Sequence, residues 1–272
     1  MDRPRPRKCA LMAAFRPRVK HVMWATGTLV CLIGVMIPAC GPLQVAVLPS
    51  FERRGADALF RVDVGDEKLV ALTIDDGPSR HTDAILDVLA ERDATATFFV
   101  HSDHVRALGD DGPRLLRRIL DEGHELGNHT AADVPSVTLS EAEFAESFGD
   151  ADALLREHGV EPRWFRAAGG TYTDAMLPVV REAGYEPAFV LGSFLPWDTF
   201  LYLPTTYGAQ LGRDVFPGAI VVLHEGQGRH AGRGPRTLKT LRWFLDRMEQ
   251  RGYEVRTLSE VVEAELVEGD AG

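Results

Sequence analysis

Short β-rich runs alternate with helical stretches from Lys68 to about Leu258, and this alternation limits the possible folds more than any other feature. It begins with the run KLVALTI, a DDGPS turn and the helical stretch AILDVLAERD. Further strand candidates are ATATFFV, HELGNH, RWFRA, PAFVLGS, GAIVVLH and YEVRTL. Repeated strand–helix alternation indicates parallel strands joined by crossover helices. About seven such units in roughly 200 residues favour an α/β fold of the (β/α) barrel type over a small open sheet.

Two of the helical stretches carry clear end signals. PRLLRRILDEG ends on Gly123, which is predicted to end that helix. LSEAEFAESFGDADALLREHG places Ser140 at an N-cap with Glu143 three residues on, the pattern of a capping box.

The first 40 residues differ from the rest in charge and in cysteine content. They hold seven basic residues and one acid, whereas the remainder carries a net charge of −16. A body this acidic argues against a nucleic-acid-binding surface. The three cysteines, Cys9, Cys31 and Cys40, all lie in this segment. Any metal site in the body must therefore use His, Asp or Glu.

The apolar run of residues 22–40, VMWATGTLVCLIGVMIPAC, follows a basic stretch and predicts a signal peptide or a membrane anchor. As a helix its 19 residues would reach about 28 Å, enough to span the hydrocarbon core. The basic flank would stay cytoplasmic, so the body is expected to be extracytoplasmic, either secreted or anchored to the membrane. The sequence Ile37-Pro38-Ala39-Cys40 also resembles a lipoprotein processing box, in which Cys40 would be lipidated. A buried helix of a soluble protein is the alternative.

These features divide the chain into three parts. We expect residues 1–40 to be the basic terminus with the signal or anchor, residues 41–66 to be a connector and residues 67–272 to be one folded domain. The domain is expected to be monomeric.

Polar residues follow most of the predicted strands, at the end where the active site of a parallel α/β barrel lies. They are Asp75, Asp76, His129, Asp133, Arg166, Asp198, His224 and Glu225. Buried charges need partners or a metal, so this gathering indicates a site. Taken singly each has a structural interpretation; DDGP alone, for example, is a common turn signal.

The adjacent carboxylates of Asp75 and Asp76 point in different directions, so one can bind a metal while the other acts as a base. His129 and Asp133 are spaced i, i+4 and would share one face of a helical or tight turn. Asp76, His129 and Asp133 are therefore the predicted ligands of one divalent ion, with positions left for water and substrate. His224 would supply a proton to the leaving group.

Four segments together resemble the polysaccharide deacetylases of carbohydrate esterase family 4, the NodB-homology domain. Thr73 to Ser79 reads TIDDGPS, similar to the family's first motif T-F-D-D-G-P-S. Gly123 to Thr130 leads into the second motif, H-[ST]-x-x-H. Phe165 to Gly170 lies where R-x-P-x-G belongs, and Ile220 to His224 matches the fifth motif. The resemblance covers about Leu69 to Leu258 and implies a distorted (β/α) barrel.

The resemblance also implies roles for individual residues. Asp75 would be the general base, held by Arg166, and His224 the general acid. Asp76 and His129 would be ligands of the metal, implied to be Zn²⁺, and a backbone N–H near Gly170 would help to stabilise the oxyanion. Asp198 is the candidate partner that orients His224, with Trp197 lining the sugar pocket.

The chain departs from the family pattern in three places. Asp133 replaces the second histidine of the second motif, which would shift the metal preference towards Mn²⁺ or Co²⁺. Ala167 and Ala168 replace the third-motif proline, and Trp197-Asp198 reverses the usual order of the fourth motif. His101 and His104 also follow a strand; they could replace the missing ligand, but surface positions on a loop are expected for them.

The predicted function is metal-dependent hydrolytic deacetylation of an extracytoplasmic acetylated polysaccharide, with a glycan containing N-acetylglucosamine as substrate. One alternative is a non-catalytic carbohydrate-binding protein of the cell envelope. Another is a different metallohydrolase, such as a phosphoesterase, which would need a second metal cluster.

Overall fold

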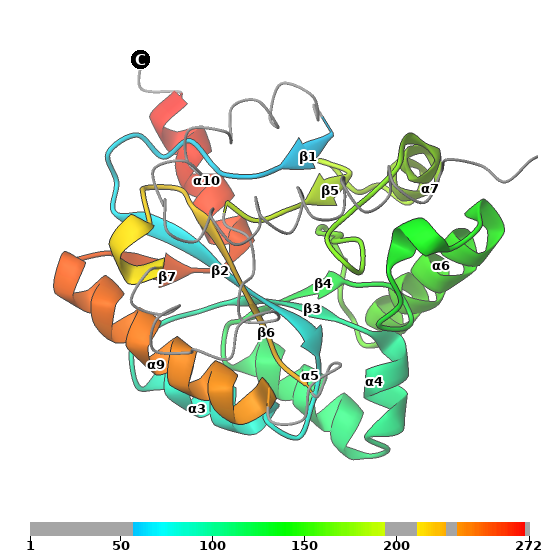
Figure 1. Ribbon diagram of the computed structural model, residues 1–272, viewed down its shortest axis with the longest axis horizontal. Coiled ribbons are helices and arrows are strands. Elements are labelled where there is room, and N and C mark those ends of the chain that lie inside the picture. The colour runs from blue at the N-terminus through cyan, green and yellow to red at the C-terminus, as the bar shows by residue number, and fades with distance from the viewer. Residues whose placement is uncertain (1–56, 194–210, 227–232, 270–272) are drawn as a thin grey trace, which may run out of the picture. The chain divides into compact units, whose positions relative to one another are not determined.

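The computed structural model describes residues 57–193, 211–226 and 233–269 (Figure 1). Its strands are β1 (Ala58–Leu59), β2 (Leu69–Gly77), β3 (Thr97–Val100), β4 (Glu125–Asn128), β5 (Phe189–Val190), β6 (Ile220–His224) and β7 (Glu254–Arg256). Its helices are α3 (Thr82–Ala90), α4 (Ser102–Ala107), α5 (Asp111–Asp121), α6 (Glu141–Glu157), α7 (Leu177–Glu182), α9 (Arg233–Arg251) and α10 (Leu258–Gly269), with short 3₁₀ turns η2 (Ser136–Thr138) and η3 (Asp174–Met176).

Strand β2 lies at the centre of a five-stranded parallel sheet. Along one edge it pairs with β6, and it also pairs with β3 and β7. Strand β4 follows β3. Every residue of β2 after Leu69 is buried. The apolar residues of this strand explain that position, because parallel strands are covered on both faces. The carboxyl end of β2, which carries Asp75 and Asp76, is therefore held from several sides.

Among the described residues, continuous strand pairing does not close the sheet into the predicted barrel. Strands β1 and β5 form a separate two-stranded parallel sheet. Two isolated bridges, Asn128–Phe165 and Arg61–Ala219, are not part of any continuous strand pairing. The physical reason is that two of the predicted strands are too short to pair continuously with their neighbours. The predicted strand RWFRA contributes one bridging residue, and β5 has two residues. The α/β class with a parallel sheet is confirmed.

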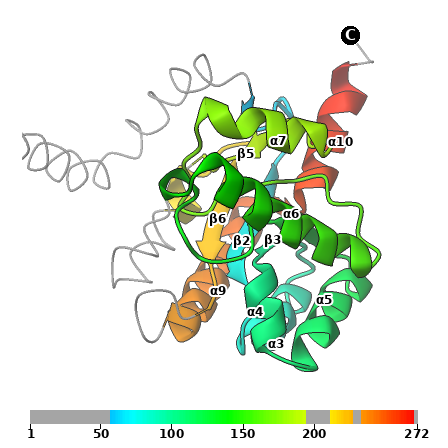
Figure 2. The same cartoon turned by 90° about the vertical axis from the view of Figure 1, so that its right-hand side faces the viewer.

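Helices cover the main sheet through apolar faces. In Figure 1, α3 lies with α9 and α5 on one side of the main sheet. In Figure 2, α6 and α7 lie one above the other, in front of the strands. Ile85 and Leu86 of α3 and Phe244 and Leu245 of α9 share one buried cluster with Leu72 of β2. Burial of such side chains supplies about 1.5–3 kcal/mol each and holds these helices on the sheet.

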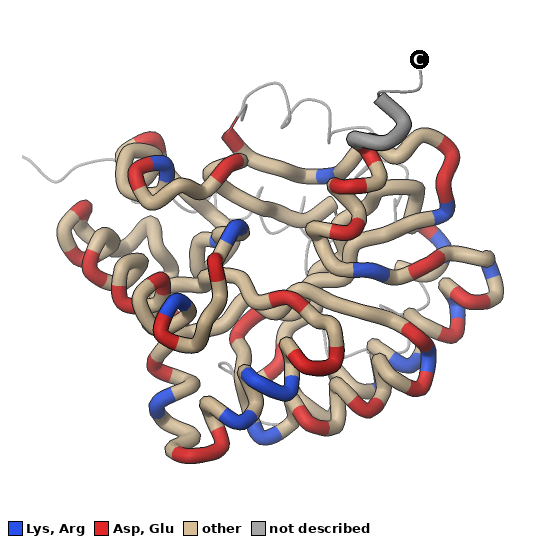
Figure 3. Tube along the Cα trace, turned by 180° about the vertical axis from the view of Figure 1, so that it is seen from behind, with Lys and Arg blue, Asp and Glu red and all other residues tan. Residues whose placement is uncertain are grey.

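Acidic and basic residues occur close together along the helices at the foot of the view in Figure 3. Arg118 of α5 pairs with Asp83 and Asp87 of α3, and Arg92 pairs with Asp246 of α9. Exposed pairs of this kind contribute about 0–1 kcal/mol each. The apolar core therefore supplies most of the stability.

The two predicted helix ends are confirmed. The N–H of Glu143 donates to Ser140 Oγ at 3.3 Å, and the N–H of Ser140 donates to Glu143 Oε2 at 2.8 Å. Both halves of the capping box at the start of α6 are thus present. Gly123, two residues after the end of α5, has a φ of 82°, which glycine adopts without a steric penalty.

The described part of the predicted connector over 41–66, residues 57–66, contains a strand and buried side chains. Strand β1 pairs with β5, and Val62 and Val64 are buried. These residues complete the apolar core beside Trp164.

The predicted signal or anchor at residues 22–40, including Cys40, lies outside the described residues. Within the part of the chain that the structure describes, no helix is long and apolar enough to cross a membrane.

Candidate metal centre and acid–base groups

The carboxyl ends of four parallel strands bring buried polar side chains together. Asp75 and Asp76 lie near the end of β2, His101 follows β3, His129 follows β4, and His224 ends β6. All five residues are buried. Charged and polar groups this deeply buried need partners, which defines a candidate functional site.

Asp75 forms a buried ion pair with Arg166. The guanidinium Nη1 lies 2.5 Å from Asp75 Oδ1 and donates to Thr73 Oγ1 at 2.8 Å. The second carboxylate oxygen, Oδ2, lies 3.8 Å from the Nε2 atoms of both His129 and His224. The structure therefore brings together the predicted base, its arginine and the predicted acid.

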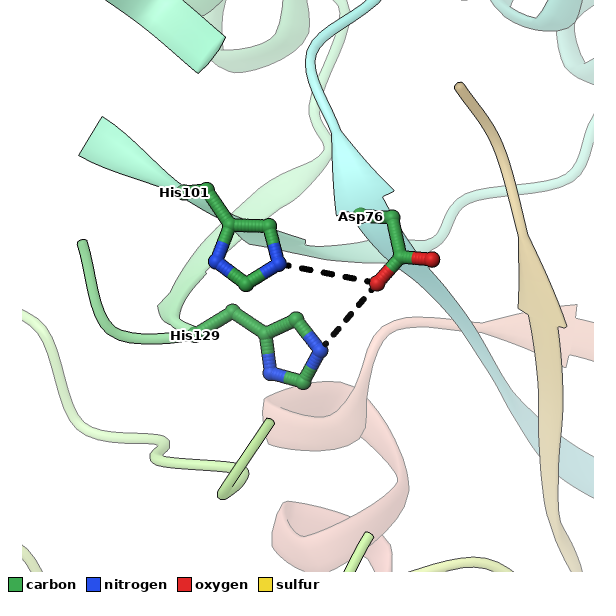
Figure 4. A group of neighbouring side chains, drawn as sticks. All are labelled: Asp76, His101 and His129. Carbon is green, nitrogen blue, oxygen red and sulfur yellow. Dashed lines mark ion pairs between the residues drawn. The ribbon is translucent and has the colours of Figure 1, made fainter. Parts of the chain in front are cut away.

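Asp76 faces a different set of partners. Its Oδ1 lies 3.6 Å from His101 Nε2 and 3.5 Å from His129 Nε2, as the dashed lines in Figure 4 show. Its Oδ2 contacts the guanidinium of Arg233. The backbone φ of Asp76 is 64°, in the left-handed region that residues other than glycine rarely adopt. Backbone conformations of this kind concentrate at functional sites.

Both imidazoles at Asp76 are oriented by backbone carbonyls. His129 Nδ1 lies 2.7 Å from the carbonyl oxygen of Arg166, and His101 Nδ1 lies 3.3 Å from that of Thr130. Because a carbonyl oxygen can only accept, each Nδ1 carries a proton, which leaves Nε2 as the ring nitrogen that could bind a metal ion. Metal-binding histidines are held in the same way.

The donor atoms fit a divalent metal ion. One ligand atom each from Asp76, His101 and His129 lies within 4.8 Å of the others. His101 Nε2 is buried and has no hydrogen-bond partner. A buried polar atom without a partner is costly, and a bound cation would satisfy it. Two imidazole nitrogens and one carboxylate oxygen form a ligand set typical of catalytic zinc.

The ionisation of these groups also favours a cation. Burial raises the pKa of Asp76, but the neighbouring His101 and His129 outweigh burial and hold that pKa well below its ordinary value. Burial lowers the pKa of His101, which keeps its ring neutral. Burial also lowers the pKa of His129, but the carboxylates of Asp75 and Asp76 raise it by more. An ionised Asp76 and a neutral His101 are conditions that metal binding requires, and the raised pKa of His129 reflects the negative potential of two carboxylates that a bound cation would meet.

The structure does not bring Asp133 into this group. Residues 131–134 form a bend rather than a helical turn, and Asp133 is exposed. The predicted i, i+4 face therefore does not exist, and the ligand set of Asp76, His129 and Asp133 differs from the cluster observed. The surface position expected for His101 is wrong as well, whereas His104 is half-buried. His101 is fully buried, and His104 Nδ1 lies 3.0 Å from the backbone oxygen of Asp76.

Two further predictions concern the far side of the site. Asp198, predicted to orient His224, lies outside the described residues, as does Trp197. The N–H of Gly170, near which an oxyanion donor was expected, donates to the carbonyl oxygen of Ala167 at 2.9 Å. That N–H is therefore already used.

Glu225 has a structural role that its position after β6 did not reveal. It is fully buried, and its Oε2 accepts hydrogen bonds from Ser79 Oγ at 2.8 Å and Thr82 Oγ1 at 2.6 Å. A Cβ at Gly77 would collide with Glu225 Oε1. Burial raises the pKa of Glu225 to about 7. Glu225 thus connects the end of β6 to the turn that follows Asp76.

A parallel α/β sheet with buried carboxylates and histidines at its carboxyl end defines a hydrolase-like site, and comparison with known proteins specifies the family. The family model of polysaccharide deacetylases matches residues 63–188. A peptidoglycan-N-acetylglucosamine deacetylase of Bacillus cereus is 30% identical over 72% of this chain and 89% of its own length. A chitooligosaccharide deacetylase of Bradyrhizobium sp. is 31% identical over 73% of this chain and 93% of its own length.

The chain belongs to the polysaccharide deacetylase family, carbohydrate esterase family 4, a family of hydrolases that act on acetylated polysaccharides. A solved structure with the same fold is that of a CE4 family pseudoenzyme from Bacillus anthracis, which is 22% identical. The TM-score is 0.64, over 75% of this chain and 68% of that one.

Proposed function

We propose that this chain is a metal-dependent deacetylase of a polysaccharide containing N-acetylglucosamine, with one divalent ion held by Asp76, His101 and His129. The observation that carries the proposal is the unpartnered Nε2 of buried His101, which faces the same Asp76 oxygen as His129 Nε2. The named activities of the Bacillus cereus and Bradyrhizobium relatives support this substrate class.

The ligand set bears on which metal is bound. An Asp-His-Asp set would favour harder ions such as Mn²⁺ or Co²⁺, whereas two imidazoles and one carboxylate suit Zn²⁺. We therefore propose Zn²⁺ as the resident ion. When bound, the ion would activate a water molecule and offset negative charge on the acetyl oxygen.

Asp75 is the proposed general base. Arg166 occupies its Oδ1, so Oδ2 remains on the side of His129 and His224. Asp75 accepts the proton of the attacking water on Oδ2, and Arg166 holds the carboxylate in place during the transfer. His224, 3.8 Å from the same oxygen, donates a proton to the departing sugar amine. No covalent link to the protein is needed.

The test is acetate release from N-acetylated glycans, chitin oligomers and peptidoglycan among them, by the zinc-loaded chain. Asp75→Asn keeps the size of the side chain but removes the base. Its acetate release should fall by about 10²–10⁴-fold with the metal still bound. Asp103→Asn, an exposed aspartate on α4, is the control and should keep full activity. Inactivity of the metal-loaded wild-type chain on every glycan would instead support a non-catalytic carbohydrate-binding protein. Background-level acetate release by both the wild type and Asp75→Asn would have the same meaning.

The proposed place of action is outside the cytoplasm. The basic flank and the apolar run of residues 22–40 support it. Cell fractionation of the full chain, with and without residues 1–40, tests this proposal. Equal amounts of both forms in the cytoplasm would contradict it.

A further inference from the structure

Each of the two adjacent aspartates has its own buried arginine. Arg166 pairs with Asp75, and Arg233, the first residue of α9, pairs with Asp76. The Arg233 side chain is 9% exposed. Its Nη1 also lies 3.5 Å from the carbonyl oxygen of Glu225. A guanidinium buried to this extent needs a negative partner, and Asp76 supplies it.

The two oxygens of Asp76 are divided between different partners. Oδ1 faces the Nε2 atoms of His101 and His129, whereas Oδ2 contacts Arg233. Arg233 therefore does not occupy the oxygen that faces the histidines. Arg233 instead holds the second oxygen, Oδ2, and so opposes rotation of the carboxylate about the Cβ–Cγ bond of Asp76.

The start of α9 is packed against the site, which fixes the place of Arg233. One turn later, Thr237 Oγ1 donates to the carbonyl oxygen of His224 at 2.6 Å. Gly234 lies so close to the ring of His81 that a Cβ there would collide with it. The helix end that carries Arg233 is thus positioned by contacts other than the ion pair itself.

We propose that Arg233 is a positioning residue of the metal centre. It holds Oδ2 of Asp76, which would leave Oδ1 to face a divalent ion together with the two imidazoles. The inference rests on the proposed function, because it assumes the ligand set of Asp76, His101 and His129. Carboxylate ligands of metals are commonly held by such hydrogen bonds, and loss of these partners costs about 10–100-fold in metal affinity.

The competing account is electrostatic. Arg233 would act as a positive charge that takes the place of a cation, and removing it would then strengthen metal binding. The two accounts predict opposite changes in the dissociation constant, so one measurement distinguishes them.

The experiment measures the dissociation constants of Zn²⁺ and Co²⁺ for the full chain by competition with a chromophoric chelator. Arg233→Met should weaken binding by about 10–100-fold. Arg233→Gln, which retains a hydrogen-bond donor without the charge, should weaken it less and guards against misfolding of the Met variant. Lys239→Met removes the same charge from an exposed position on α9 and should leave the affinity unchanged.

A second readout is the visible absorption spectrum of the Co²⁺-loaded chain, which reports ligand geometry. It should change in Arg233→Met and stay constant in Lys239→Met. Unchanged or tighter metal binding by both Arg233 variants, with one ion still bound to the wild type, would overturn the positioning role alone. A wild-type chain that binds no ion would overturn the proposed metal centre and this inference with it.

Discussion

Asp75 and Asp76 are chemically identical neighbours whose surroundings give them different properties. Asp75 shares one oxygen with Arg166 and turns the other towards two histidines. Asp76, at a φ of 64°, turns one oxygen towards His101 and His129 and the other towards Arg233. The two carboxylates cannot exchange partners without a change of backbone conformation. Substitutions at neighbouring positions of this site should therefore have distinct effects.

At this scale the first prediction concerns the third metal ligand. His101→Ala should lose bound zinc, because the ion loses one of three donor atoms. Asp133→Ala should keep full occupancy, because Asp133 is exposed and outside the cluster. Metal content by atomic emission after dialysis measures both, with circular dichroism as the control for folding. Loss of zinc in Asp133→Ala, with zinc kept in His101→Ala, would restore the ligand set expected from sequence.

The second prediction concerns Glu225 and the pH dependence of stability. Its pKa is about 7 in the folded protein against an ordinary value of 4.5, so the folded state binds this proton more tightly than the unfolded state. The resulting stabilisation is complete below about pH 4.5 and is lost as the pH rises through 7. The glutamine in Glu225→Gln cannot titrate. The free energy of unfolding of the wild type minus that of the variant should therefore fall by about 1–3 kcal/mol between pH 5 and pH 8.

Urea denaturation at a series of pH values measures that difference. Glu146→Gln, at an exposed position of α6, is the control and should follow the wild-type profile. Parallel profiles for wild type and Glu225→Gln would show that Glu225 does not titrate in this range.

At the scale of single elements, the capping box of α6 permits a direct test. Ser140→Ala removes the acceptor for the Glu143 N–H and should lower the free energy of unfolding by about 1 kcal/mol. Glu146→Ala, an exposed change within the same helix, should have an effect near zero. The midpoints of urea denaturation compare the two variants. An equal effect of both would mean that the cap contributes no stability.

Elements were predictable from sequence where one local signal sufficed. The runs that became β2, β3 and β6 are largely apolar, and Ser140 and Gly123 marked helix ends correctly. RWFRA looked similar, but only Phe165 bridges to a neighbour, because its pairing depends on segments distant in the chain.

The candidate site was predictable to the extent that it follows strand ends. Asp75, Asp76, His129 and His224 were found by that rule, and the same rule also pointed to His101, directly after β3. The family pattern has no ligand at that position, and the spacing of His129 and Asp133 favoured Asp133 instead. The backbone after β4, with Thr130 at a φ of 70°, leads Asp133 to the surface. Arg233 had no local signal, because its partner lies far away in the sequence.

At the scale of the whole molecule, the position where the folded domain begins can be tested by truncation. A chain of residues 50–272 retains β1, Val62 and Val64 and should unfold cooperatively with its metal bound. A chain of residues 67–272 lacks these buried side chains and should have a clearly lower melting temperature, since each buried valine supplies about 1.5–3 kcal/mol. Calorimetry measures both. Equal melting temperatures would show that residues 57–66 contribute nothing to the fold.

The pairing of β2 with β6 determines when the site can first exist during synthesis. Asp75 is in register with His224, about 150 residues later in the chain. A ribosome releases both aspartates and both metal-facing histidines long before it releases the proposed general acid. A nascent chain can therefore gather the three proposed ligands while the acid–base pair is still incomplete. Contacts this distant in sequence form slowly, so we expect the proposed acid–base pair to be complete only after β6 has joined the sheet.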